Sequence, residues 1–239
     1  MRDFEFILEE RADEVQTHLD FIRSLEAAAT GRSEGGGMLR VDAEPINILK
    51  SGFLVHLYNV VEAVMTKALE EVEIAAKVYP PRKWRDGLLK EWAKARLNLK
   101  RDITAGQAEE RVFDLLQEAA GRRVVDRLRI ERKGGNWSHE EVQRITSAIS
   151  CPLDINAAVE TAACVQIFED DLVPLKYIRA KRNRLAHGEE SFVDGARHLT
   201  SDRLEALRAP VIDYMREVVA SFNSYLDGEG FLITEQAAS

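Results

Sequence analysis

Apolar residues recur at three- and four-residue intervals along most of this 239-residue chain. That spacing is the period of one face of an α-helix. No segment alternates apolar and polar residues over the length of a β-strand, and the sequence has no internal repeat. The spacing therefore predicts an all-α fold. It is clearest over residues 3–28 and 201–227, where the apolar positions are Leu8, Ala12, Val15, Leu19 and Ile22, and Leu204, Leu207, Val211, Met215, Val218, Phe222 and Tyr225.

Helix-breaking and helix-capping residues divide the rest of the chain. Pro80 and Pro81 end one helix, because proline has no N–H to continue the hydrogen-bond pattern. Ser138 and Glu141 have the spacing of a capping box at the start of another helix. The expected helices cover residues 45–78, 82–101, 107–120 (apolar stripe Val112, Leu115, Leu116 and Ala119), 138–150, 156–168, 171–187 and 201–227, with Asp170 or Asp171 and Ser201 as caps and residues 122–132 as a continuation.

Length and composition favour one globular domain. The hydrophobic share of 45% suits a sizeable core. Within that domain we expect an acidic helix in residues 1–30, a bundle in 45–226 and a loose tail over 229–239. The sequence lacks a run of 18 apolar residues and an apolar signal-peptide core, so we expect a cytoplasmic protein without a membrane partner.

Cysteine and histidine usage points to no metal and no cofactor. Two cysteines, Cys151 and Cys164, do not make a disulfide framework or a metal-binding pattern. The histidines outside the segment described below also lack metal-ligand spacing. They are His18, His56, His139 and His198.

The charge is unevenly distributed. A net charge of −8 argues against a broad, nonspecific nucleic-acid binder. Residues 82–133 nevertheless contain 15 Lys and Arg against 9 Asp and Glu. This excess is consistent either with a local positive groove or with solvated helix faces.

A cationic segment ends in a histidine and a glycine. Five cations lie within the nine residues 176–184, and His187 and Gly188 follow. Apolar residues at helical spacing predict a helix here that ends at Gly188. The five cations are Lys176, Arg179, Lys181, Arg182 and Arg184.

The segment R-N-R-L-A-H-G-E-E-S-F resembles the RN-x-LAHG-x-x-SF motif of a bacterial branch of the HEPN superfamily (higher eukaryotes and prokaryotes nucleotide-binding). Residues 57–62 (L-Y-N-V-V-E) and 134–137 (G-G-N-W) are also similar to that branch. The resemblance covers about residues 45–226. It implies an HEPN-type bundle of long antiparallel helices. Many HEPN proteins are metal-independent ribonucleases whose site forms in a cleft between two protomers, so it also implies RNA as substrate and a homodimer.

The motif residues suit RNA cleavage. RNA carries its own nucleophile, the 2′-hydroxyl, beside the phosphate. His187 would transfer the proton, and Arg182 would stabilise the charge that develops on the phosphorane. Asn183 would orient His187 or bind substrate. The cations Arg184, Lys181 and Arg179 would contact phosphates or be solvated.

Helical geometry separates the two principal residues. Positions five apart differ by about 140° around an ideal helix, so Arg182 and His187 do not share a face. Three arrangements stay open. Arg182 reaches round the helix, His187 departs from helical geometry, or the arginine of one protomer meets the histidine of another.

A polar group at i, i+1 and i+4 lies within the apolar 45–78 helix. Its members are Tyr58, Asn59 and Glu62. We expect a buried network that fixes the motif helix, and substrate contact is the alternative. The tryptophans Trp84, Trp92 and Trp137 are expected in the core rather than stacked on bases.

The preferred functional hypothesis is an endoribonuclease that acts as a toxin or antiphage-defence effector, with an antitoxin protein as a candidate partner. The alternative is a non-catalytic HEPN module that binds a nucleotide or a partner protein. HEPN toxins silenced by a nucleotidyltransferase often carry a tyrosine two residues after the motif histidine. Glu189 stands at that position, which argues against control of that kind.

Overall fold

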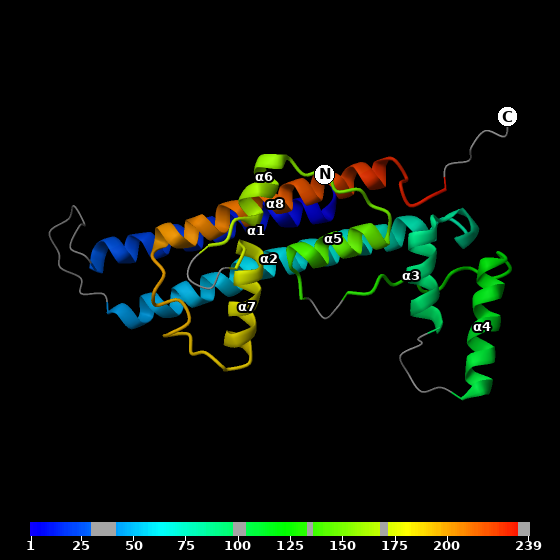
Figure 1. Cartoon of the computed structure of the whole chain (residues 1–239), viewed down its shortest axis with the longest axis horizontal. Helices are drawn as coiled ribbons and strands as arrows, with labels where there is room; N and C mark the ends of the chain where they lie inside the picture. Colours follow the sequence, from blue (N-terminus) through cyan, green and yellow to red (C-terminus); the bar gives the residue numbers. More distant parts are fainter. Residues whose placement is uncertain (30–41, 98–103, 133–135, 168–171, 234–239) are drawn as a thin grey trace. The chain divides into compact units, whose positions relative to one another are not determined.

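The fold is all-α, as predicted. The computed structural model describes residues 1–29, 42–97, 104–132, 136–167 and 172–233 (Figure 1). In these residues two isolated bridges occur, but no strand forms. The helices are α1 (Asp3–Ala29), α2 (Ala43–Lys77), the 3₁₀ helix η1 (Pro81–Lys83), α3 (Asp86–Leu97), α4 (Ala105–Ala119), α5 (His139–Ala148), α6 (Ala157–Cys164), α7 (Pro174–Ala186) and α8 (Ser201–Asp227).

The chain forms two compact units. Unit 1 contains residues 1–65, 136–139 and 155–218, and unit 2 contains residues 66–135, 140–154 and 219–239. The long helices α2 and α8 contribute to both units. The HEPN-like motif belongs to unit 1, whereas the basic segment 82–133 belongs to unit 2.

In unit 1, one carboxylate joins three long helices. Glu26 on α1 lies 2.6 Å from the ammonium of Lys50 on α2. It also accepts a 3.1 Å hydrogen bond from the backbone N–H of Ser201 at the start of α8. Arg216 on α8 donates to both oxygens of Glu9 on α1, at 3.0 and 2.8 Å. The predicted apolar positions of α1 are buried, so α1, α2 and α8 pack together in unit 1.

In unit 2, aromatic residues fill the core. The indole N–H of Trp84 donates to the carbonyl of Ala76 at 2.8 Å, and its ring packs edge-on against Trp92. The hydroxyl of Tyr225 on α8 donates to the carbonyl of Ile149 after α5 at 2.6 Å. Trp84, Trp92 and, in unit 1, Trp137 are all buried, which confirms their predicted place in the core.

Residues 122–132 are not a helical continuation, and this expectation was wrong. Gly121 has φ +72°, a left-handed conformation that ends α4. The following segment is irregular but held to α2. The N–H of Ile130 donates to Glu73 at 2.9 Å, and Arg132 pairs with Glu73 at 3.1 Å and with Glu70 at 3.3 Å.

Several element ends also differ from expectation. Trp84 precedes α3 instead of lying within it, because η1 and an extended residue follow Pro80. Helix α6 ends at Cys164 instead of continuing to residue 168. The side chain of Thr200, rather than Ser201, caps α8 by accepting from the N–H of Arg203. The expected capping residues Asp170 and Asp171 lie outside the described residues.

The tail is ordered further than expected. Phe231 is buried, the N–H of Ile233 donates to the carbonyl of Lys83 at 2.8 Å, and the carbonyl of Leu232 accepts from Arg85 at 3.0 Å. Residues 231–233 therefore pack against other segments of unit 2, so a loose tail cannot begin at residue 229.

Helix α2 is long and apolar enough to cross a membrane, by length and composition alone. Its most apolar 18-residue window has a mean hydropathy of 1.3, and 56% of that window is buried inside the protein. A buried core helix of a soluble protein passes the same test, so this feature does not assign α2 to a membrane.

Candidate active site

Helix α7 carries the motif and ends where the sequence predicts. Pro174 occupies the first turn, where a missing N–H costs no helical hydrogen bond. Gly188 has φ +71°, its N–H donates to the carbonyl of Leu185, and the N–H of Glu189 donates to the carbonyl of Arg184 at 2.9 Å. This pair of bonds is a Schellman motif, and it fixes His187 as the C-cap residue that follows Ala186.

Arg182 is held by three groups of unit 1. Its guanidinium donates to the carboxylate of Glu62 on α2 at 3.0 Å and to the side-chain oxygen of Asn183 at 3.1 Å. The guanidinium carbon also lies 5.2 Å from the ring centre of Tyr58, within the range of a cation–π contact. The side chain is 25% exposed, so it is oriented yet accessible to a ligand.

Tyr58 links α2 to the segment before α5. Its ring is fully buried, and its hydroxyl accepts a 2.7 Å hydrogen bond from the backbone N–H of Trp137. Burial raises the pKa of Tyr58, so the phenol stays protonated at neutral pH. The amide nitrogen of Asn183 in turn lies 3.4 Å from the side-chain oxygen of Asn136. The structure thus brings together the three sequence segments that resemble HEPN proteins.

The expected buried network forms only in part. Tyr58 and Glu62 contact Arg182, but Asn59 is exposed. Asn59 lies three positions before Glu62 on α2, so the two share a helix face. Arg179, half-buried, acts electrostatically on the Tyr58 phenol. An exposed amide beside Glu62 suits the alternative expectation, substrate contact.

Lys181 is placed differently from expectation. Its side chain is 5% exposed, and its ammonium lies 2.8 Å from Glu190. A buried, paired lysine is not free to contact a phosphate, so the structure corrects this predicted role. Arg184 remains a candidate for substrate contact because its side chain is 42% exposed, even though its Nε lies 3.6 Å from Glu190. Sequence reasoning missed Glu190, because its spacing of nine residues from Lys181 is not one that places two residues together on a helix.

The side chain of His187 makes no polar contact with the residues that the structure describes. It is exposed, and its ring makes no hydrogen bond or ion pair with any described residue. Its backbone φ of −89° and ψ of 0° remain near helical values, while the Arg182 side chain turns toward α2. Two arrangements left open by the sequence, a reaching Arg182 and a displaced His187, therefore find no support. The Asn183 side chain contacts Arg182 and Asn136 instead of the His187 ring.

The described residues contain no group of three or more His, Cys, Asp or Glu side chains placed to hold a metal ion. Cys151 is buried and Cys164 exposed, and both are free thiols. Burial raises the pKa of Cys151 to about 12, which makes its thiol unreactive at neutral pH.

Comparison with known families decides the relationship. The model of the HEPN_MAE_28990-like HEPN family matches residues 6–231, nearly the whole chain. The chain belongs to this HEPN family. Comparisons with curated proteins and with solved structures gave no match. Membership of an HEPN family makes a nuclease or a nucleotide-binding module the coarse functional class.

Proposed function

We propose that this HEPN protein is an endoribonuclease in which Arg182 and His187 act on the scissile phosphate. The observation that carries the proposal is the contrast between these two residues. Arg182 is preoriented by Glu62, Asn183 and Tyr58, whereas His187 is exposed at the C-terminal end of α7. Preoriented positive charge and an accessible proton carrier are the two groups that RNA cleavage requires.

The substrate itself supplies the nucleophile. His187 accepts the proton of the 2′-hydroxyl, whose oxygen attacks the adjacent phosphorus. Arg182 stabilises the negative charge of the phosphorane. The 5′-oxygen then leaves and takes up a proton, giving a 2′,3′-cyclic phosphate and a 5′-hydroxyl. Asn183 positions Arg182, and Arg184, Arg179 and Asn59 contact neighbouring parts of the RNA. Because no water is activated, this route needs no metal ion.

Two copies of the chain complete the proposed site. Arg182 and His187 lie on different faces of α7, so one copy does not direct both at one phosphate. A two-fold interface would place the arginine of one copy opposite the histidine of the other. The expected oligomer is therefore a homodimer. The expected biological role is that of a toxin or antiphage-defence effector in the cytoplasm, with an antitoxin protein as a possible partner.

The proposal is tested by cleavage of a labelled RNA of mixed sequence. The wild-type protein should cut it in the presence of EDTA and leave a 2′,3′-cyclic phosphate. His187→Ala should lower the rate by about 10²–10⁴-fold with an unchanged circular dichroism spectrum, since the side chain is exposed. Equal cleavage of DNA with the same sequence, or loss of activity in EDTA with rescue by magnesium, would refute the mechanism.

One observation favours a second candidate, a nucleotide- or partner-binding module without catalysis. Arg182 is already paired with Glu62 at 3.0 Å, and a neutralised arginine is less available to a phosphate. In that case purified protein should bind a nucleotide or a partner but leave the labelled RNA intact over hours. The same cleavage assay therefore separates the two candidates.

A further inference from the structure

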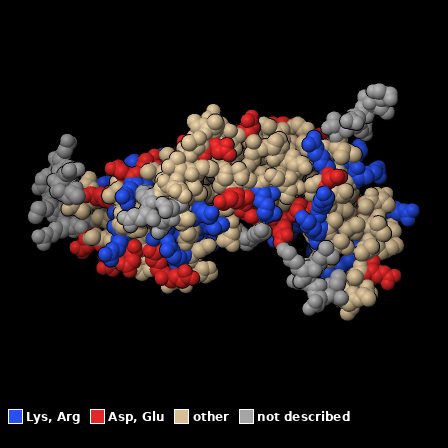
Figure 2. Space-filling model, viewed as in Figure 1, with Lys and Arg blue, Asp and Glu red and all other residues tan. Residues whose placement is uncertain are grey.

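The two units differ in charge. The segments of unit 2 contain equal numbers of basic and acidic residues, so the net charge of −8 comes entirely from unit 1. Within unit 2, Lys and Arg side chains gather over η1, α3 and the end of α4, with few acidic side chains between them (Figure 2). This face is therefore a positive feature of a protein whose net charge is −8.

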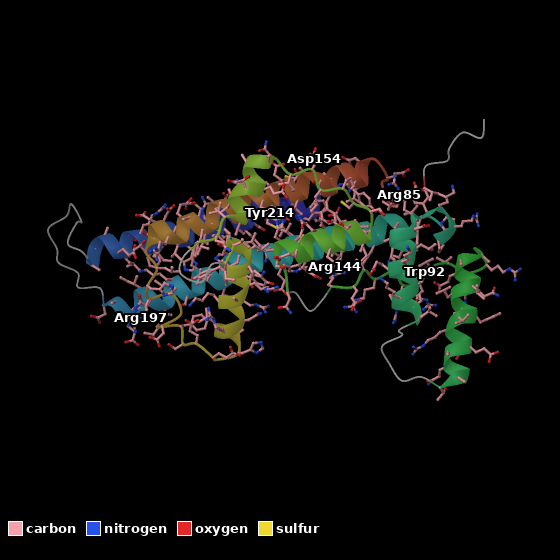
Figure 3. All side chains as sticks on the ribbon, in the orientation of Figure 1. Arg85, Trp92, Arg144, Asp154, Arg197 and Tyr214 are labelled. Carbon is pink, nitrogen blue, oxygen red and sulfur yellow. The ribbon has the colours of Figure 1, made fainter. Side chains whose placement is uncertain are left out.

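Cations from two distant parts of the sequence meet on this face. A Cβ added to Gly121 at the end of α4 would lie 3.0 Å from a guanidinium nitrogen of Arg82 in η1. Lys83 is the next residue of η1, and Arg122 follows Gly121 directly. We call Arg82, Lys83 and Arg122 the basic cluster. Arg85, which directly precedes α3 (Figure 3), and Arg123 extend it.

The basic cluster is not neutralised by the residues that the structure describes. Elsewhere in unit 2 cations do have acidic partners: Arg96 pairs with Glu118, and Arg132 pairs with Glu70 and Glu73. Arg82, Lys83 and Arg122 are exposed, and none of them makes an ion pair with a described carboxylate. Like charges held together without a counter-charge repel one another, so this arrangement favours a bound polyanion.

Exposed apolar side chains lie on α4 beside these cations. Phe113 is 60% exposed. Val112 and Leu116, which were expected in the apolar stripe of this helix, are exposed as well. Arg123 pairs with Asp114, the residue that follows Phe113 on α4, so the segment that carries the basic cluster folds back along α4 as far as the turn that contains Phe113. An exposed aromatic ring beside cations is the combination that single-stranded nucleic acid uses, with bases stacked on the ring and phosphates on the cations.

We propose that this face of unit 2 is a docking surface for single-stranded RNA, with the basic cluster on the phosphates and Phe113 stacked on a base. The inference rests on the proposed function for the choice of RNA, because an RNase needs to hold its substrate beyond the reacting phosphate. It adds a binding surface outside the HEPN motif. An acidic protein is the competing occupant, and competition with polyglutamate distinguishes it from RNA.

The test measures RNA binding without cleavage. Full-length His187→Ala protein is titrated against a fluorescein-labelled single-stranded RNA at several salt concentrations. Adding Arg82→Ser, Lys83→Ser and Arg122→Ser should weaken binding by about tenfold or more near 50 mM salt. It should also reduce the slope of log affinity against log salt by about 2, since each phosphate contact contributes roughly 0.7 for a single strand.

Two controls isolate the surface. Arg11→Ser, Arg197→Ser and Arg203→Ser, all in unit 1, change the net charge equally and should leave the affinity within about twofold. Phe113→Ala should weaken binding several-fold without changing the salt slope, because stacking releases no counterions. All three variants are checked by thermal unfolding, and all substituted side chains of the basic cluster are exposed.

The outcomes separate this inference from the proposed function. Unchanged affinity and slope in the basic-cluster variant, or an equal loss in the unit 1 control, would overturn the docking surface even if the wild type cleaves RNA. Displacement of the RNA by polyglutamate at equal charge concentration would also overturn it in favour of an acidic protein. Conversely, RNA binding that depends on the basic cluster, with no cleavage by the wild type, would support the docking surface and contradict the proposed endoribonuclease activity.

Discussion

At the scale of residues, Arg182 makes a set of contacts that a lysine at the same position could not make. Its planar guanidinium donates to Glu62 and to Asn183 while it lies near the ring of Tyr58. Arginine supports such a fork because its donors are fixed in one plane, whereas a lysine ammonium is a single charge on a flexible stem. The contacts therefore orient the charge as well as hold it.

Arg182→Lys should consequently keep the fold and lose most of the activity. We expect RNA cleavage to fall by about 10²–10³-fold, the size typical for removing one well-placed donor to a developing charge. Initial rates at saturating RNA measure the effect, and circular dichroism serves as the control for folding. A lysine variant with more than about a third of the wild-type rate would show that orientation of the guanidinium is unimportant.

Tyr58→Phe should instead affect stability. The change keeps the ring beside Arg182 but leaves the buried N–H of Trp137 without its 2.7 Å partner. An unsatisfied buried donor costs about 1–3 kcal/mol, which urea unfolding can measure. Tyr79→Phe is the matched control, because that hydroxyl bonds to Glu229 on the surface and its loss should cost much less. Equal costs at the two positions would contradict the role assigned to Tyr58.

At the scale of elements, helical periodicity predicted the helices well and their ends less well. Gly188 was correctly predicted as the end of α7, because glycine readily adopts positive φ. Gly121 does the same for α4, yet the apolar residues Val125, Leu128 and Ile130 after it resemble a helix in the sequence. They are buried in an irregular segment, which the pairing of Arg132 with Glu70 and Glu73 stabilises. Such distant pairing has no local signal.

Gly188→Ala tests how the end of α7 positions His187. Gly188 has φ +71° and open space around its Cα, so alanine would meet backbone strain but no clash. We expect a loss of about 1 kcal/mol in stability together with lower RNase activity, because the Schellman motif would distort beside His187. Gly188→Asn should be closer to wild type, since asparagine tolerates the left-handed conformation. Identical behaviour of the two variants would exclude backbone strain as the cause.

At the scale of the whole molecule, the sequence predicted the principal residues of the candidate site but only some of the contacts that hold them. The motif gave Arg182 and His187, and helical geometry alone separated their faces. Periodicity could not show that Lys181 is buried against Glu190 or that Asn136 reaches Asn183, because these contacts join segments far apart in sequence or beyond a helix end. Because Arg182 and His187 lie on different faces of α7, the proposed site needs one residue from each of two copies of the chain.

If each site combines Arg182 of one copy with His187 of the other, two inactive variants should restore activity when they dimerise together. A heterodimer of Arg182→Ala and His187→Ala contains one site with both residues intact and one site with neither. Random pairing makes half of the dimers heterodimers, so the mixture should recover about a quarter of the wild-type rate. The two chains are co-refolded or co-expressed, and cleavage of labelled RNA is measured at equal total protein.

The control mixture pairs Arg182→Ala with a chain that carries both substitutions. It forms heterodimers equally well but contains no intact site, so it should stay at the level of either variant alone. Recovery in the first mixture and none in the second requires residues from two copies at one phosphate. If light scattering shows that the variants exchange subunits and the first mixture still stays inactive, the proposal of a shared site is wrong. Arg182 and His187 then act within one chain, and one of the two side chains must change its position when RNA binds.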